Sequence, residues 1–213
     1  MIPYRFDAIG DTRSPQERDY LQQIGQTFEA SPFSTLEKLM NFPLYVPRQN
    51  LTTFLVKYNI FQRILSVHGS IIECGVGFGG GLMTWAQLSA MLEPTNYSRR
   101  IIGFDTFAGF PSVSPHDTAH VGELAVDSQA EIERCARLYD TNRCVGHIPK
   151  VEVVKGNACE TMEKYMQDNP HLVVSLLYLD FDLYEPTLAA LKTFRRRIPV
   201  GGIIAFDELN LKA

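Results

Sequence analysis

Five short apolar segments, each followed by glycine or acidic residues, recur in the sequence after His68. The segments are Ile71–Cys74, Ile101–Phe104, Val151–Val154, Leu172–Leu179 and Ile203–Phe206. Stretches with a helical pattern separate them, at Leu82–Leu92, Asp127–Leu138, Asn157–Gln167 and Tyr184–Arg197. In the second of these helices Ile132 and Leu138 are expected to face inward. This alternation predicts an α/β fold with a doubly wound, mostly parallel sheet and right-handed helical crossovers.

The first 67 residues carry helical signals and no strand-like segment, so we expect a helical extension (1–67) ahead of an α/β domain (68–213). Ser-Pro and a Ser-x-x-Glu capping box open the first two of three expected helices, at Gln16–Ala30, Thr35–Asn41 and Leu51–Val67. In the third helix, the apolar face is predicted from helical spacing at Phe54, Tyr58, Phe61 and Leu65. The extension is expected to cap a site or to form a subunit contact.

The composition is that of an ordinary globular chain, with 213 residues, 45% hydrophobic residues and a formal net charge of −4. This mild acidity argues against a nucleic-acid partner, and no apolar run approaches the roughly 18 residues that span a bilayer. The N-terminus lacks the order of a signal peptide, and the four cysteines form no Cys-x-x-Cys pair. We therefore expect a cytoplasmic protein with reduced thiols.

Ligands of doubly wound sheets bind beyond the carboxyl ends of the strands, so the residues there are the candidate site. The first strand is followed by a glycine loop, Gly75–Gly81, which also contains the dinucleotide pattern G-x-G-x-x-G. Asp105 follows the second strand, where its carboxylate can accept hydrogen bonds from both ribose hydroxyls or cap a turn. Asn157 follows the third, where its amide can pair with an adenine edge or cap the next helix.

Acidic residues after the last two strands are the most informative feature: Asp180 and Asp182, then Asp207 and Glu208. Two strands deliver them to one edge of the sheet, where their repulsion is costly without a cation. Mg²⁺ would offset that cost, because it prefers carboxylate oxygens. In an extended segment Asp180 and Asp182 would point the same way. The alternative is that Asp182 caps a helix and that the last two acids solvate a turn.

Taken together, these motifs resemble those of class I S-adenosylmethionine-dependent methyltransferases, and more narrowly those of the macrocin O-methyltransferase (TylF-like) family. The specific segments are Gly103–Pro111, Leu179–Thr187, Pro199–Gly202 and Phe206–Glu208. The resemblance implies a Rossmann-like fold and Mg²⁺-dependent methylation of a hydroxyl on a sugar or glycosylated natural product. Proteins of this class usually end in a β-hairpin after the fifth strand, which we expect to be missing or replaced here.

Carried over by position, the resemblance implies three groups of site residues. The cofactor-binding group is Glu73, Cys74, Gly75, Val76, Gly77, Gly79, Asp105, Thr106, Phe107, Gly156, Asn157, Ala158 and Asp180. The metal-binding group is Asp180, Asp207 and Glu208, where Glu208 replaces a more usual aspartate with a longer carboxylate. The catalytic residues are Asp182, as general base, and Asp180.

The implied mechanism begins with Mg²⁺ on two neighbouring acceptor oxygens, where it lowers the pKa of one hydroxyl. Asp182 would then take the proton, and the alkoxide would attack the sulfonium methyl group in line.

The same residues are also compatible with three other functions. These are a methyltransferase with a catechol-like acceptor, an inactive cofactor-binding protein and a NAD-dependent oxidoreductase. The oxidoreductase has little support, because the sequence contains no Tyr-x-x-x-Lys motif and the acidic residues would be unexplained. The sheet edge at Ile203–Phe206 favours pairing with another chain, so we expect a homo-oligomer. Its substrate is expected to be a small molecule, without nucleic-acid or membrane partners.

Overall fold

The computed structural model describes residues 13–207, which form two compact units that divide between Val56 and Lys57. The division falls ahead of the boundary at residues 67 and 68 that was expected from the sequence. The end of helix α3 (Arg48–Ile64) therefore belongs to the second unit. None of the helices in residues 13–207 combines the length and the apolar character that a membrane-spanning helix needs.

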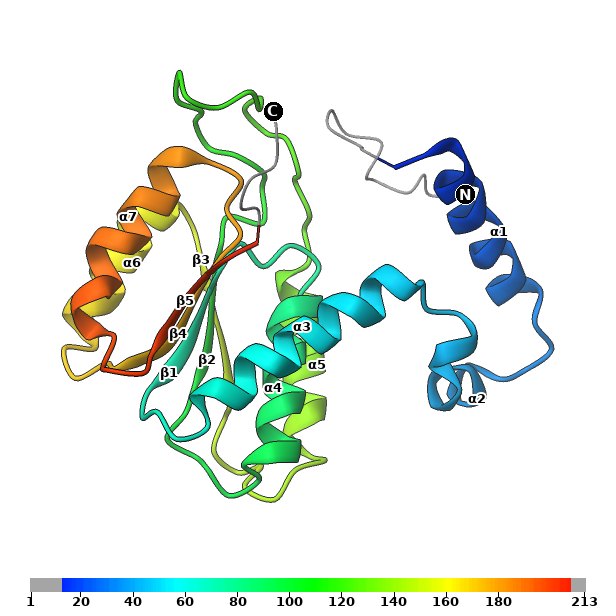
Figure 1. The fold of residues 1–213 in the computed structure, drawn as a ribbon, viewed down its shortest axis with the longest axis horizontal. Helices are drawn as coiled ribbons and strands as arrows, with labels where there is room; N and C mark the ends of the chain where they lie inside the picture. The colour runs from blue at the N-terminus through cyan, green and yellow to red at the C-terminus, as the bar shows by residue number, and fades with distance from the viewer. Residues whose placement is uncertain (1–12, 208–213) are drawn as a thin grey trace. The chain divides into compact units, whose positions relative to one another are not determined.

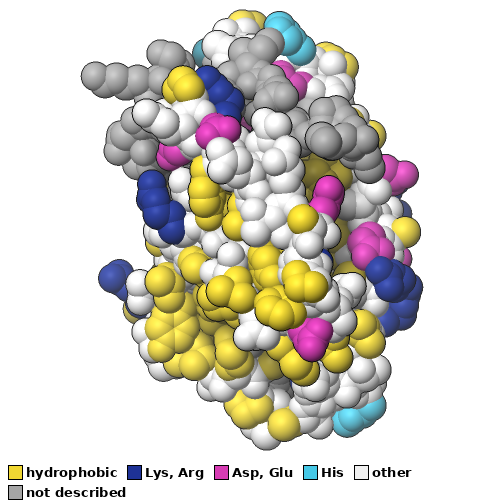
Figure 2. All heavy atoms as spheres, turned by 90° about the vertical axis from the view of Figure 1, so that its right-hand side faces the viewer, with side chains coloured by type: hydrophobic (Ala, Val, Ile, Leu, Met, Phe, Trp, Pro, Cys, Tyr) yellow, Lys and Arg dark blue, Asp and Glu magenta, His cyan; other side chains and the backbone are white. Residues whose placement is uncertain are grey.

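The first unit consists of short helical elements: α1 (Pro15–Ala30), α2 (Thr35–Met40), the 3₁₀ turn η1 (Phe42–Leu44) and the start of α3. The capping box predicted at Ser34 is present, and Ser14 forms a second one. Each serine side chain accepts the N–H of the glutamate three residues on, and each glutamate accepts in return. Most large apolar side chains of this unit are exposed, and Figure 2 shows hydrophobic side chains gathered on the face that it displays. Exposed examples are Leu36, Leu39, Met40 and Leu44.

The second unit is a five-stranded parallel sheet with the strand order β3-β2-β1-β4-β5 (Figure 1). The strands are β1 (Ser70–Cys74), β2 (Ile101–Asp105), β3 (Val151–Lys155), β4 (Val174–Leu179) and β5 (Ile203–Phe206). Helices α6 (Ala158–Asp168) and α7 (Tyr184–Phe194) cover one face, and α4 (Gly80–Leu92) and α5 (Gln129–Asp140) cover the other. The predicted doubly wound α/β fold is thus confirmed, and its strand order reverses between β1 and β4.

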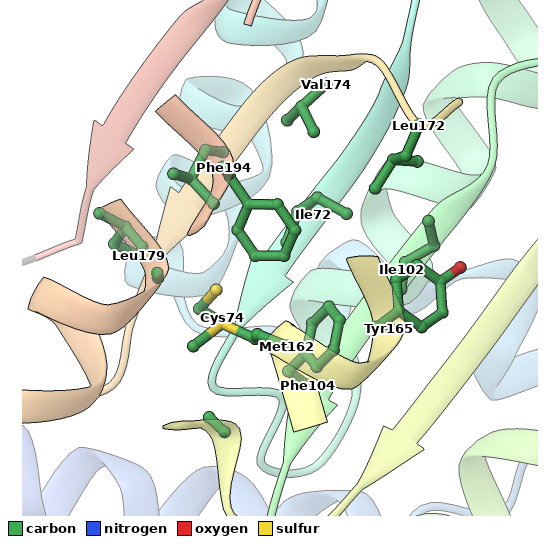
Figure 3. Packing of buried hydrophobic residues seen from close by; sticks show 13 residues of the cluster. Ile72, Cys74, Ile102, Phe104, Met162, Tyr165, Leu172, Val174, Leu179 and Phe194 are labelled. Atoms are coloured by element: carbon green, nitrogen blue, oxygen red, sulfur yellow. The ribbon is translucent and has the colours of Figure 1, made fainter. Parts of the chain in front are cut away.

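A hydrophobic core fills the space between the sheet and the pair α6 and α7 (Figure 3). Phe104 of β2 packs against two aromatic rings of this core, with ring centroids 5.4 Å from Tyr165 and 5.9 Å from Phe194. All six residues of β4 are buried, as the nearly unbroken apolar run of that segment predicts for a central parallel strand. The core holds the strand ends rigidly, which is what positions the residues that follow them.

Several details of the helices differ from the sequence predictions. In α3 the buried residues are Lys57, Phe61 and Ile64. On the predicted face Phe54 and Tyr58 are half-buried, but Leu65 is 39% exposed. The prediction left out Lys57 because a charged residue was not expected on the buried face of a helix. The helix predicted to end at Arg197 changes to the 3₁₀ turn η2 (Arg195–Arg197).

The inward face of α5 was also predicted incorrectly at one residue. Ile132 is buried as expected, but Leu138 is 66% exposed. Six residues separate the two, which places them on different sides of a helix with 3.6 residues per turn. Ala136 and Tyr139, four and seven residues after Ile132, share its face and are buried instead.

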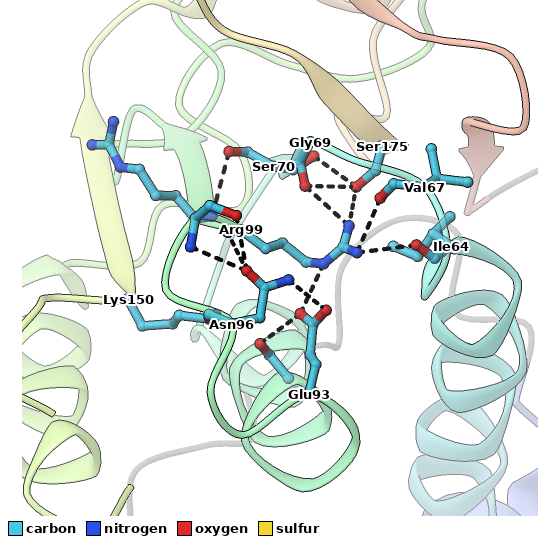
Figure 4. Close-up of polar contacts among 12 residues, drawn as sticks. Ile64, Val67, Gly69, Ser70, Glu93, Asn96, Arg99, Lys150 and Ser175 are labelled. Atoms are coloured by element: carbon cyan, nitrogen blue, oxygen red, sulfur yellow. Dashed lines mark hydrogen bonds and ion pairs between the residues drawn. The ribbon is translucent and has the colours of Figure 1, made fainter. Parts of the chain in front are cut away.

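Arg99 connects three segments at the end of the sheet where β1 and β4 begin (Figure 4). Its guanidinium donates to the carbonyls of Gly69, Ile64 and Val67 and to the hydroxyl of Ser175, at 2.5–3.1 Å. Its Nε also donates to Glu93 at 2.8 Å. The side chain is almost fully buried, so these partners replace its water shell.

Candidate active site

The carboxyl ends of β1 and β4 lie against each other at the point where the strand order reverses. The N–H of Asp180 donates to the carbonyl of Cys74 at 2.7 Å, and the N–H of Gly75 donates to the carbonyl of Phe104 at 2.9 Å. Gly75 has a φ of 90°, and a Cβ there would lie 1.9 Å from the carbonyl oxygen of Asp180. Only glycine allows this approach, which places the glycine loop beside the acidic residues.

Asp105 shapes the glycine loop from the end of β2. Its Oδ2 accepts the N–H groups of Val76 and Gly77 at 2.7 and 2.9 Å, and its Oδ1 accepts the N–H of Phe107 at 2.7 Å. The turn-capping interpretation of Asp105 is therefore confirmed. Because each carboxylate oxygen can accept more than one hydrogen bond, this arrangement leaves capacity for a ribose hydroxyl.

Glu73 lies buried on the face of β1 that α4 covers. It pairs with the Lys57 ammonium at 3.6 Å, and the two side chains are 2% and 5% exposed. Burial raises the pKa of Glu73 to about 7, although the ammonium opposes that rise. The Oε2 of Glu73 and the Nε1 of Trp85 have no hydrogen-bond partner among the described residues. A buried oxygen of this kind can accept a hydrogen bond from a donor group on a bound molecule.

Asn157 caps α6 at the end of β3. Its side-chain oxygen accepts the N–H of Cys159 at 3.1 Å, and its amide nitrogen donates to Glu160 at 3.2 Å. The preceding Gly156 donates its N–H to the carbonyl of Asp105 at 2.9 Å, which ties the ends of β2 and β3 together. The helix-cap interpretation is confirmed, and Asn157 lies at the strand ends where a cofactor base is expected in this class of sheet.

Asp180, Asp182 and Asp207 lie at the ends of β4 and β5 and line one cavity, and one prediction about their backbone is wrong. Burial raises the pKa of Asp180 to about 8, and the carboxylates of Asp207 and Asp182 add to the rise. Asp182 has a φ of 57°, so the segment after β4 is not extended and the alternation argument for Asp180 and Asp182 is wrong. A turn forms there because α7 begins two residues later, at Tyr184.

A cavity of about 280 Å³ lies beside these acids, between the ends of β4 and β5 and the start of α7. Asp180, Asp182 and Asp207 line it together with apolar residues that include Leu183 and Phe206. It is open enough to admit a small polar molecule next to carboxylates. The cavity thus lies at the carboxyl ends of two strands, the edge of the sheet where ligands of such sheets bind.

The carboxylates of Asp180 and Asp207 provide the oxygen ligands that a divalent cation such as Mg²⁺ prefers. Within residues 13–207 no group of three or more metal-ligating side chains is assembled, and the third expected ligand, Glu208, lies outside the described residues. The mutual repulsion that raises the Asp180 pKa is the electrostatic situation that a bound cation relieves. Asp180 and Asp207 could therefore hold Mg²⁺ together with oxygens from outside the described residues or from ligands.

The long segment after β2 reaches the start of α7. The carboxylate of Asp117 accepts the N–H of Tyr184 at 2.8 Å, and the ring of His116 lies 4.6 Å from the ring of Tyr184. His116 is an exposed residue, so this ring contact lies at the surface. The segment thus contacts Tyr184, which lines the cavity.

The sequence analysis did not identify two residues of this region, Lys57 and Tyr178. The hydroxyl of Tyr178 donates to Oδ1 of Asp207, and burial together with that bond raises the pKa of the tyrosine, so it stays protonated. A signal for Lys57 exists in hindsight, because Lys57, Phe61 and Ile64 follow helical spacing. For Tyr178 the sequence shows only one aromatic residue within an apolar strand.

Comparison with known proteins gives a consistent result. The sequence model of the macrocin O-methyltransferase (TylF) family matches residues 57–213. The crystal structure of CalS11, described as a calicheamicin methyltransferase, is 37% identical and has a TM-score of 0.89 over 93% of this chain and 80% of that chain. Curated protein sequences yield no match.

Two further structures support the fold. An apo structure of CalS11, described as a TDP-rhamnose 3'-O-methyltransferase of calicheamicin biosynthesis, is 35% identical, with a TM-score of 0.82 over 93% of this chain and 80% of that one. The O-methyltransferase NovP is 22% identical, with a TM-score of 0.57 over 73% of this chain and 64% of that one. The similarity to NovP is a similarity of fold.

Proposed function

The chain belongs to the TylF family of macrocin O-methyltransferases, and on that premise we propose that it methylates a hydroxyl of a sugar, either nucleotide-bound or on a natural product. Methyl transfer from S-adenosylmethionine follows from the family. The sugar acceptor is supported by the similarity to CalS11, whose described substrate is a TDP-sugar. The observation that carries the proposal is the contact of the glycine loop with Asp180, which places the expected cofactor site beside acidic residues.

The cofactor would lie over the carboxyl ends of β1, β2 and β3. In this proposal the glycine loop and the free oxygen of Glu73 face its methionine part, Asp105 accepts the ribose hydroxyls, and Asn157 lies near the adenine. The backbone N–H groups of Val76 and Gly77 are already directed at Asp105, so the loop is held in shape before the cofactor binds. Such preorganisation reduces the entropy lost on binding.

The acceptor would occupy the cavity beside the acidic residues. Asp180 and Asp207, with Glu208, are the proposed ligands of Mg²⁺, which when bound would lower the pKa of an acceptor hydroxyl. Asp182 lines the same cavity and is exposed to it, so it can take the proton of that hydroxyl. The other wall residues orient the acceptor and reduce its contact with water.

The proposal is tested by incubating the purified protein with S-adenosylmethionine, Mg²⁺ and one acceptor at a time. TDP-rhamnose, a glycosylated macrolide and catechol form a suitable panel. We expect S-adenosylhomocysteine to appear together with a singly methylated sugar, detected by mass spectrometry, and catechol to remain unchanged. Methylation of catechol alone would contradict the sugar acceptor. Failure to bind S-adenosylhomocysteine in calorimetry would contradict methyl transfer altogether.

We also propose that the chain assembles through the edge of its sheet. Within the described residues β5 pairs only with β4, and its Ile204 and Phe206 are each 39% exposed. An open strand edge with apolar side chains favours pairing with a second copy. We expect sedimentation equilibrium to show a dimer or larger oligomer, and Ile204→Lys to shift it toward the monomer. A monomeric wild-type protein at micromolar concentration would disprove this assembly.

A further inference from the structure

We propose that Lys57 is a positioning residue that holds both Glu73 and Tyr178, and so links the proposed cofactor site to Asp207. The inference rests on the proposed function, because it concerns how the cofactor-binding residues and the acidic residues are positioned relative to one another. None of the motifs that resemble the family includes this lysine.

The first step is the contact between Lys57 and Glu73. The ammonium lies 3.6 Å from Oε1 of Glu73, and both side chains are buried. The same Oε1 lies against the first turn of α4, where a Cβ on Gly81 would be 2.0 Å from Oε1 and 3.1 Å from the ammonium nitrogen. Glycine at position 81 therefore makes room for this ion pair. The pair fixes one carboxylate oxygen and leaves Oε2 without a partner in the described residues.

The second step is the contact between Lys57 and two aromatic rings. The ammonium lies 3.5 Å from the ring centroid of Tyr178 and 4.6 Å from that of Trp85. The two rings also meet edge to face, with centroids 5.6 Å apart. A desolvated ammonium over aromatic faces is a favourable cation–π contact, and it restricts both rings.

The third step connects Tyr178 to the acidic residues. Glu73 of β1 and Tyr178 of β4 are register partners, and Tyr178 is the partner of Ala205 on β5. Asp207 follows two residues after Ala205, so the four side chains point to one face of the sheet. The hydroxyl of Tyr178 donates to Asp207 and thereby orients its carboxylate. A continuous chain of contacts thus runs from Glu73 through Lys57 and Tyr178 to Asp207.

Charge supports this role. Lys57 is the cation that lowers the pKa of both Glu73 and Asp180, in opposition to burial and to the neighbouring carboxylates. Placing it between the two sites stabilises the carboxylates without occupying the cavity. Its loss would leave Glu73 buried without a counter-charge and the ring of Tyr178 free to change its rotamer.

The test compares Lys57→Met, Lys57→Arg and Tyr178→Phe with wild type by calorimetry, using S-adenosylhomocysteine and Mg²⁺ separately. We expect Lys57→Met to weaken both ligands about 10- to 100-fold, the range known for outer-shell partners of metal sites. Lys57→Arg keeps the positive charge and should retain most of the wild-type affinity for both ligands. Tyr178→Phe should weaken only Mg²⁺, and adding it to Lys57→Met should weaken Mg²⁺ no further.

Lys38→Met is a matched control, because Lys38 is also buried, lies 4.7 Å from the ring centroid of Phe28 and belongs to the first unit. It should change neither affinity. Trp85 is the single tryptophan of the sequence, so its emission reports the Lys57 contact without any ligand and should change in Lys57→Met. If Lys57→Met binds both ligands as wild type does, the inference is wrong. If wild type itself does not bind S-adenosylhomocysteine, the proposed function is wrong instead.

Discussion

Replacing Arg99 with methionine is expected to lower the free energy of unfolding by about 3–5 kcal/mol, as when one partner of a buried charged network is removed. The substitution keeps most of the side-chain volume but leaves Glu93 without its ion pair and removes one hydrogen-bond donor from each of the carbonyls of Gly69, Ile64 and Val67. A protein of this size has a stability of roughly 5–15 kcal/mol, so the loss is a large fraction of the total. The measurement is denaturant unfolding followed by circular dichroism.

Arg100→Met is the matched control for this prediction. Arg100 is the next residue, but its side chain is 38% exposed and pairs with a half-exposed Glu152, so its loss should cost at most about 1 kcal/mol. Both residues lie at the end of the sheet opposite the candidate site. Folded Arg99→Met should therefore bind S-adenosylhomocysteine like wild type. An unchanged unfolding midpoint in Arg99→Met would refute the structural role of this network.

Replacing Asp180 with asparagine is expected to abolish Mg²⁺ binding and to lower kcat by at least about 10²–10³-fold, because an electrostatic group at the reaction site is lost. The fold should not suffer. With a pKa of about 8, Asp180 carries a proton at neutral pH when no cation is bound, and asparagine resembles that protonated acid in shape. Asp168→Asn, at the exposed end of α6, is the control and should keep wild-type activity.

The pH dependence separates this explanation from a general loss of activity. Below a pH of about 8 a cation must displace the proton of Asp180, so the Mg²⁺ affinity of wild type should rise with pH and level off above that value. Calorimetry in buffers of different ionisation enthalpy should detect about one proton released per cation at pH 7. Mg²⁺ affinity that does not change between pH 6 and 8 would contradict the role of Asp180.

Without Mg²⁺, the free energy of unfolding should also depend on the ionisation of Asp180. A raised pKa favours the protonated folded state, so wild type should lose stability relative to Asp180→Asn as the pH rises from 3.8, the ordinary value, toward 8. Added Mg²⁺ should reverse that loss in wild type only. Thermal unfolding at several pH values, with and without Mg²⁺, measures both effects.

For Asp105 and Asn157 the sequence predicted the position and two possible roles. Each follows a strand, and the cap of α6 by Asn157 is a local contact that the neighbouring residues indicate. The hydrogen bonds from the glycine loop to Asp105 join distant parts of the chain and became clear only from the structure. For Asp182 the prediction assumed an extended backbone, which its φ of 57° contradicts, although its side chain lines the same cavity as Asp180.

The sequence by itself determined the succession of strands and helices along the chain, the capping box at Ser34 and the identity of the acidic residues at the strand ends. These features depend on neighbours within a few positions, through apolar periodicity and local hydrogen bonds. Only the tertiary structure decided the partners of Arg99 and Lys57 and the approach of Gly75 to Asp180. Those contacts join residues that are far apart in the chain, and buried charges take their partners from whatever the packing of the sheet brings near.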